Sequence, residues 1–254
     1  MPDRANVLGV GVSAVNMKDA MRTMFDWVDR KERHYVCVTG VHGVMESQRS
    51  PELRRIHNAA GMVTPDGMPL AWMLKWAGFR DTDRVCGPEL MPLMFQEAQA
   101  RGVGHFLYGG SPRALELLHQ RLLTMAPNAK IVGTHSPPFR ALTAAEDAAI
   151  VSQINASGAD IVWVGLSTPK QERWMAAHRE SLTAAVLIGV GAAFDIHAGL
   201  VERAPNFLRR TGLEWTWRMV KEPRRLWRRY LSSNPRFVAL ILLQMTGLYR
   251  PNLQ

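Results

Sequence analysis

The stretch "DIVWVGLSTPKQERWM", residues 160–175, passes from an apolar run through a polar turn into a helical pattern. Residues 160–166 are apolar at nearly every position, which is typical of a strand covered on both faces of a parallel sheet. A strand that leads directly into a helix is the repeating unit of α/β folds. This stretch therefore predicts that the chain is built from such units.

The same alternation continues along most of the chain. Further apolar runs predict strands at residues 34–39, 61–64, 105–109, 129–134 and 184–191. Helical patterns lie at 17–32, 88–102, 112–127 and 143–158, and the last begins with "TAAE", a capping-box pattern. We therefore expect an α/β body with a mostly parallel sheet flanked by helices.

After about residue 200 the sequence contains no strand candidate and becomes helical, basic and rich in tryptophan. We divide the chain into an α/β body, residues 1–200, and a basic helical appendage, residues 201–254. The net charge of the chain is +9, and residues 201–236 contain ten Lys and Arg against three Glu. Such a basic segment suits phosphates, whether of nucleic acid, lipid headgroups or a nucleotide diphosphate.

The composition narrows the class of protein. The 254 residues are 47% hydrophobic and 21% charged, which is ordinary for a soluble globular protein. Cys37 and Cys86 are the only cysteines and lie far apart, so the sequence has no disulfide framework and no zinc signature. This cysteine usage fits a reducing cytosol. No apolar stretch reaches the roughly 20 residues of a membrane-spanning helix.

A carboxylate, Asp66, directly follows the strand predicted at residues 61–64. Ligands of open α/β sheets bind beyond the carboxyl ends of the strands, where this residue would lie. Asp66 has two interpretations. It can be the N-cap of a helix that begins near Met68, or a general base whose pKa is raised by apolar neighbours.

Two strand-to-helix turns have residues suited to anions. In "FLYGGSPRAL" the glycines Gly109 and Gly110 permit close approach of a phosphate, and Ser111 would cap the next helix. In "VGLSTPKQERWM" the turn contains Lys170, Gln171 and Glu172. Both turns also have ordinary structural interpretations: a strand-to-helix connection for the first, and a capping box with a solvated lysine for the second.

Two more regions carry candidate residues. Asp195 follows the glycines of "GVGAAFDIHAG", where an acid can accept hydrogen bonds from a ribose or a base. In the appendage, Arg218, Arg225 and Arg228 are spaced to share a helix face, with Pro223 between the first two. They can clamp a diphosphate or form a solvated basic face. The tryptophans of this segment can enter a membrane interface or pack on the body.

Two motifs are discounted. "GVGVSA", residues 9–14, imitates a dinucleotide fingerprint but follows no clear strand. "DTD", residues 81–83, imitates a metal-binding motif but lies in a polar loop. The histidines show no metal-ligand spacing, so no metal site is expected.

Taken together, the motifs resemble those of the WecG/TagA/CpsF family of glycosyltransferases. They are "TPDGMPLAW", "RVCGPEL", "FLYGGSP", "STPKQERWM", "GVGAAFDIHAG", "RAP" and "GLEWTWRMVKEPRR", in the family's order. The similarity runs from about Val7 to the basic tail. Within the family, "CVTGVHGVME" is most similar to the exopolysaccharide branch of the xanthan-type, GumM-like glucosyltransferases.

The resemblance implies a Rossmann-like core and an inverting, metal-independent transferase without a cofactor. Its donor would be a UDP-sugar, and its acceptor a polyprenyl-diphosphate-linked saccharide. It would act as a peripheral enzyme at the cytoplasmic face of the inner membrane, on an anionic surface, as a monomer or an oligomer. The family's catalytic base corresponds to Asp66. The other matches are Thr39 and Gln171 in the active site, Arg84 and Asp195 at the substrate, and Arg218, Arg225 and Arg228 at the diphosphate.

Four functional hypotheses follow. The GumM-like similarity favours β-1,4 transfer of glucose in exopolysaccharide synthesis, and relatives with Asn shortly after the Thr differ from the Gly40–His42 segment found here. The alternative within the family is transfer from UDP-ManNAc, or from its uronic acid, in cell-envelope polymer synthesis. The basic tail alone would also fit a nucleic-acid-binding protein, and the N-terminal glycines a nicotinamide-dependent enzyme.

Overall fold

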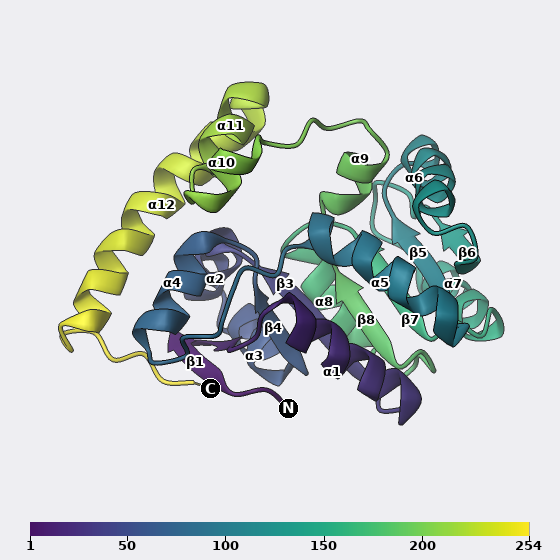
Figure 1. Ribbon diagram of the computed structural model, residues 1–254, viewed down its shortest axis with the longest axis horizontal. Helices are drawn as coiled ribbons and strands as arrows, with labels where there is room; N and C mark the ends of the chain where they lie inside the picture. Colours follow the sequence, from purple (N-terminus) through teal and green to yellow (C-terminus); the bar gives the residue numbers. More distant parts are fainter. Residues whose placement is uncertain (254) are drawn as a thin grey trace. The chain divides into compact units, whose positions relative to one another are not determined.

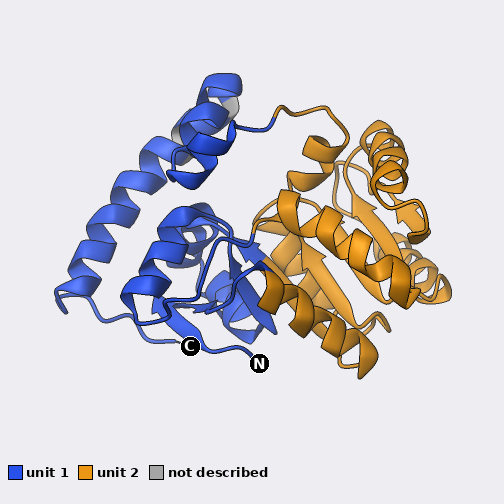
Figure 2. Cartoon of the chain, in the orientation of Figure 1, with its two compact units in different colours: residues 1–17, 38–85, 203–254 blue, residues 18–37, 86–202 orange. Residues whose placement is uncertain are grey.

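The structure is a computed structural model that describes residues 1–253, apart from the side chains of Arg225, Arg228 and Arg229. It divides into two compact units (Figure 2). Unit 1 comprises Met1–Met17, Val38–Val85 and Arg203–Gln254, and unit 2 comprises Lys18–Cys37 and Cys86–Glu202.

Six of the strands form one sheet with the order β4-β3-β8-β7-β5-β6. These strands are β3 (His34–Thr39), β4 (Met62–Pro65), β5 (Gly104–Gly109), β6 (Lys130–His135), β7 (Ile161–Gly165) and β8 (Val186–Gly189). Every pair with a described register is parallel, namely β3 with β8, β8 with β7, β7 with β5, and β5 with β6. The predicted α/β class, with a mostly parallel Rossmann-like sheet flanked by helices, is confirmed.

Unit 2 contains the centre of this sheet and the helices that cover it (Figure 1). Its helices are α1 (Met17–Asp29), α5 (Gly87–Arg101), α6 (Pro112–Met125), α7 (Ala144–Ala156), α8 (Lys170–His178) and α9 (Ala193–His197). The side chain of Trp163 on β7 is fully buried, and its Nε1–H donates to Nδ1 of His105 over 3.1 Å. Since β5, β7 and β8 are buried at almost every position, both faces of the sheet bury side chains here.

Unit 1 begins with an antiparallel hairpin of β1 (Arg4–Val7) and β2 (Val10–Ser13). Its helices are α2 (Val41–Arg49), α3 (Pro51–Ala59), α4 (Met68–Trp76), α10 (Asn206–Arg210), α11 (Glu214–Lys221) and α12 (Pro223–Met245). The long helix α12, yellow in Figure 1, packs against α2. Near its end, Gln244 accepts from the Leu8 N–H over 2.9 Å and donates to the Asn6 carbonyl. The basic C-terminal segment is therefore joined to the N-terminal hairpin within unit 1.

The predicted strands are all present, with ends shifted by two residues or fewer. The sequence did not predict β1 and β2, which have four residues each and too short a periodicity to recognise. The glycine motif at residues 9–14 leads into β2 rather than into a helix, and residues 81–83 lie in a loop. Contrary to the expectation that the glycine motif follows no clear strand, β1 precedes it, but the helix that a dinucleotide fingerprint requires does not follow it. Within residues 1–253, no helix has the length and apolar character needed to span a membrane.

Candidate active site

Asp66 lies immediately after β4 and is tied to the end of β3. Its backbone N–H donates to the Thr39 carbonyl over 2.9 Å. Its Oδ2 is 3.9 Å from the point where a Cβ on Gly40 would stand, so the carboxylate lies beside that glycine. The N-cap residue of α4 is Gly67, which excludes the interpretation of Asp66 as the N-cap. The half-buried carboxylate is thus held at the carboxyl ends of two strands.

Thr39 is the last residue of β3, and its side chain is buried. Its Oγ1 lies 3.1 Å from Nε2 of His57, which projects from the interior of α3. A Cβ on Gly43 would meet the Thr39 methyl group at 2.8 Å, so Gly43 leaves the space that this side chain needs. The structure therefore places Thr39 next to Asp66 along the backbone and next to His57 through its hydroxyl.

Arg84 forms an ion pair with an acid of the C-terminal segment. Its Nη1 is 2.8 Å from Oε2 of Glu214, and only 10% of the Arg84 side chain is exposed. Arg218 follows Glu214 by one turn of α11, so these two side chains share a face of the helix. Within the described residues, Nε of Arg218 is buried without a hydrogen-bond partner. Arg225 and Arg228 lie on α12, but their side chains are outside the described part of the chain.

In unit 2, the end of β5 approaches the end of β7 closely. A Cβ on Gly109 would lie 2.6 Å from the Gly165 carbonyl oxygen, and Gly109 has φ +122°, so no other residue fits there. Gly110 donates its N–H to the same oxygen over 3.2 Å. Ser111 is the N-cap of α6, where its Oγ accepts from the Ala114 N–H over 3.1 Å, as predicted. The turn presents backbone and a helix N-terminus, as an anion site requires.

The turn after β7 contains a buried network of polar side chains. Oε1 of the fully buried Glu172 accepts from Thr168 Oγ1 over 2.8 Å and from Gln171 Nε2 over 3.1 Å. A carboxylate only accepts, so the amide of Gln171 must turn its NH₂ toward Glu172. Oε1 of Gln171 therefore points toward Gly191, whose Cβ position lies 3.4 Å away. In the described residues this oxygen and Oε2 of Glu172 are buried without partners.

The remaining predicted residues of unit 2 are more accessible. Lys170 is exposed at the start of α8, which agrees with a solvated lysine and leaves it open to a ligand. Asp195 is half-buried on the short helix α9, and its carbonyl accepts from the N–H groups of Leu200 and Val201. The helix follows Gly191 and packs against α5 and α6 (Figure 1).

The predicted residues thus form two groups. Thr39, Asp66, Arg84 and Arg218 belong to unit 1, whereas Gly109, Gly110, Ser111, Lys170, Gln171, Glu172 and Asp195 belong to unit 2. Sequence reasoning missed His57 and Glu214. The sequence around a single histidine in a helix does not show which residues the side chain contacts. Glu214 was considered only as one of the three acids that reduce the net charge of the basic segment.

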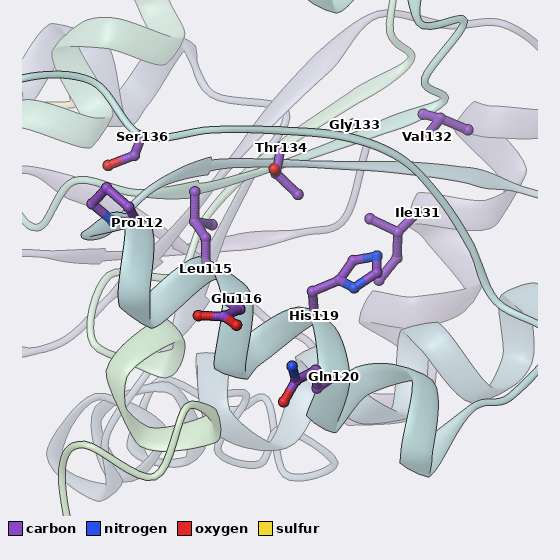
Figure 3. A pocket seen from close by; sticks show the side chains of 10 residues that line it. All are labelled: Pro112, Leu115, Glu116, His119, Gln120, Ile131, Val132, Gly133, Thr134 and Ser136. Carbon is purple, nitrogen blue, oxygen red and sulfur yellow. The ribbon is translucent and has the colours of Figure 1, made fainter.

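A cavity of about 570 Å³ lies between α6 and β6 (Figure 3). Its walls include Glu116, His119, Thr134 and Ser136, and none of the residues predicted for the site. Ser136 connects it indirectly to the β5 turn, because its Oγ donates to the Gly110 carbonyl over 2.7 Å. Within the described residues, no three His, Cys, Asp or Glu side chains cluster as metal ligands would.

Comparison with known proteins identifies the family to which the chain belongs. Residues 5–251 match the model of the glycosyl transferase WecG/TagA/CpsF family. The chain is also similar to N-acetylglucosaminyldiphosphoundecaprenol N-acetyl-beta-D-mannosaminyltransferase of Bacillus spizizenii (strain ATCC 23059 / NRRL B-14472 / W23). The two are 26% identical over 226 residues, which cover 89% of this chain and 85% of the relative.

The comparison corrects one expectation, because the relative's name describes an N-acetylmannosaminyltransferase and not a xanthan-type glucosyltransferase. The expected exopolysaccharide branch is therefore without support. The family itself is confirmed by the match over nearly the whole chain. This protein belongs to the WecG/TagA/CpsF family and is a glycosyltransferase.

Proposed function

We propose that the protein transfers an N-acetylmannosaminyl group from a UDP-sugar to an N-acetylglucosaminyl group on a polyprenyl diphosphate. The observation that carries this proposal is the match over 89% of the chain to a relative named for that transfer. Such a reaction would serve the synthesis of a cell-envelope polymer.

The position of Asp66 supports its role as the catalytic base. It is half-buried at the ends of β3 and β4, fixed through its backbone to Thr39, and beside the open space at Gly40. In the proposed reaction its carboxylate takes the proton of an acceptor hydroxyl while that oxygen attacks the anomeric carbon of the donor. The bond from this carbon to the UDP diphosphate breaks on the opposite face, so the anomeric configuration inverts.

Arginine side chains supply the charge that the leaving group needs. The departing diphosphate gains negative charge, which Arg84 and Arg218 in unit 1 can stabilise, together with Arg225 and Arg228. Guanidinium groups bind phosphate oxygens in pairs, and this suits a transferase that works without a metal ion. In unit 2 we assign donor binding to the Gly109–Ser111 turn, Lys170, Gln171, Glu172 and Asp195.

The surface of α12 supports a peripheral position at the cytoplasmic face of a membrane. Apolar side chains at helical spacing are exposed along one side, namely Trp227, Leu231, Val238, Leu242 and Met245. Buried residues of the same helix, including Phe237 and Ile241, lie on the adjacent face. An exposed apolar stripe beside basic residues is typical of a helix that lies in a membrane interface.

A second candidate, transfer of glucose, rests only on the resemblance described under Sequence analysis, in which Gly40–His42 contains no Asn. Radiolabelled UDP-ManNAc, UDP-GlcNAc and UDP-glucose can be offered with a synthetic N-acetylglucosaminyl diphosphate lipid, with and without EDTA. We expect product from UDP-ManNAc that EDTA does not reduce. Product from UDP-glucose alone would establish the second candidate, and an enzyme that EDTA inactivates would exclude the metal-independent mechanism.

A further inference from the structure

A buried chain of hydrogen bonds connects the interior of α3 to the proposed base. His57 and Ser47 are buried beneath Thr39, with 0% and 1% of their surfaces exposed. Ser47 Oγ lies 3.2 Å from Nδ1 of His57, and Nε2 of the same ring lies 3.1 Å from Thr39 Oγ1. The Thr39 carbonyl then accepts from the Asp66 N–H over 2.9 Å. The imidazole of His57 therefore lies between the backbone of α3 and Thr39, whose carbonyl accepts the hydrogen bond from Asp66.

The partners of His57 determine which ring nitrogen carries the proton. Nδ1 lies 2.9 Å from the Leu53 carbonyl oxygen, which can only accept a hydrogen bond. Ser47 donates its own proton to the Gly43 carbonyl over 2.9 Å, so its oxygen is also an acceptor toward the ring. In the neutral imidazole, the proton must then be on Nδ1. Nε2 is left with a lone pair directed at Thr39.

The Thr39 hydroxyl has one proton, and it donates this proton in a hydrogen bond to the lone pair of Nε2. Gly43 adds a steric constraint, because a Cβ there would be 2.8 Å from the Thr39 methyl group and 3.6 Å from Nε2. Thr39 thus has one orientation in which its methyl group fits against Gly43 and its hydroxyl donates to His57. Any other group that hydrogen-bonds to this hydroxyl has to act as the donor.

We propose that His57 is a positioning residue: as the Nδ1–H tautomer it accepts the Thr39 hydroxyl proton, fixes Thr39, and through the Thr39 carbonyl fixes Asp66. The catalytic consequence rests on the proposed function, since it takes Asp66 as the base. A base displaced by a fraction of an ångström loses much of its rate advantage, because proton transfer requires near-attack geometry. His57 itself touches neither substrate nor reacting atoms in this assignment.

Two substitutions of His57 distinguish the contribution of Nδ1 from that of Nε2. In His57→Gln the amide oxygen can take the place of Nε2 and accept from Thr39. In His57→Asn the shorter amide reaches the partners of Nδ1 but not Thr39. We expect His57→Gln to keep kcat within about threefold and His57→Asn to lower it about tenfold or more, with KM for the donor little changed. Because His57 acts through Thr39, adding His57→Asn to Thr39→Val should lower kcat no further.

A spectroscopic measurement tests the tautomer without any assay of activity. The protein has eight histidines, and long-range correlation spectra of nitrogen-15 histidine, compared with His57→Gln, identify the signals of His57. We expect a protonated Nδ1 and an Nε2 whose shift moves toward that of a free nitrogen in Thr39→Val. We also expect the Asp66 amide to exchange with solvent faster in His57→Asn than in His57→Gln.

The outcomes are distinct. A proton on Nε2, an unchanged Asp66 exchange rate in His57→Asn, or effects of His57→Asn and Thr39→Val that multiply would each overturn the proposal. If His57→Asn does not fold, the tautomer of the wild type and the response of Nε2 to Thr39→Val decide it alone. A wild type that transfers no sugar contradicts the proposed function, while the spectra still support or refute the role of His57.

Discussion

Nη1 of Arg84 lies 2.8 Å from Oε2 of Glu214, and this ion pair ties the loop before α5 to the first residue of α11. Arg84 is among the residues proposed to meet the donor diphosphate. In the proposed complex, a phosphate oxygen would compete with the Glu214 carboxylate for Arg84. The same helix face carries Arg218 one turn later, so Glu214 lies between two cations of the proposed anion site.

Replacing Glu214 should therefore strengthen the binding of UDP. Glu214→Gln keeps the size of the side chain and leaves Arg84 without a competing negative charge. Since a partly exposed ion pair is worth up to about 1 kcal/mol, we expect the Kd for UDP to fall up to about fivefold at low salt. Calorimetric titration measures this, with Glu202→Gln, an exposed acid of the same segment, as the control. Weaker binding would mean that Glu214 holds Arg84 in place for the ligand.

Asp66→Asn should remove the proposed base while keeping the fold. We expect kcat to fall by about 10²–10⁴, because general-base catalysis contributes that much, while the Kd for UDP and the thermal midpoint stay close to wild type. Asp81→Asn, at an exposed carboxylate of the loop at residues 81–83, is the matched control. Turnover near the wild-type rate in Asp66→Asn would assign proton removal to another group.

Acid should destabilise unit 2 through His105. Burial lowers the pKa of this histidine from 6.5 to about 3, against a smaller opposing effect of Asp160. Between these two values the unfolded chain binds a proton that the folded chain does not, so stability rises with pH and is lost as pH falls. In this range the free energy of unfolding changes by up to about 1.4 kcal/mol for each pH unit.

Denaturant unfolding at several pH values between about 4 and 6 checks this expectation. His105→Gln should flatten the dependence of the unfolding free energy on pH, whereas His119→Gln, at a partly exposed histidine of α6, should leave it unchanged. An equally steep dependence in His105→Gln would show that other groups cause the loss of stability in acid.

The exposed apolar stripe of α12 should be the surface through which the protein binds membranes. Leu231 and Leu242 are 57% and 56% exposed on this stripe, so Leu231→Glu combined with Leu242→Glu should cost little stability. A charge on each should prevent the stripe from entering the interface, and co-sedimentation with anionic vesicles should fall about tenfold or more. Phe139→Glu, at a side chain 93% exposed in unit 2, is the control. Unchanged sedimentation of the double variant would place the membrane contact elsewhere.

The sequence by itself determined the six strands of the parallel sheet, the class of fold and the family. Buried parallel strands such as residues 160–166 are recognisable because their period and apolarity are local properties of the chain. Caps are local too, and for this reason Ser111 and the capping box at Thr143 were predicted correctly. The glycines at residues 109 and 110 were predicted either to admit a phosphate or to form an ordinary turn; the structure shows a turn packed closely against Gly165, and the phosphate site stays a prediction.

Only the tertiary structure decided the partners of the candidate site residues. His57 is 18 residues from Thr39 and Glu214 is 130 residues from Arg84, so no periodicity or spacing connects either pair. The sequence favoured Asp66 as an N-cap because Asp is a good N-cap residue, and only the structure showed that α4 begins one residue later, with Gly67 as its N-cap. Hydrogen bonds and ion pairs of this kind form only after the sheet and its helices have packed, because packing fixes which distant side chains meet.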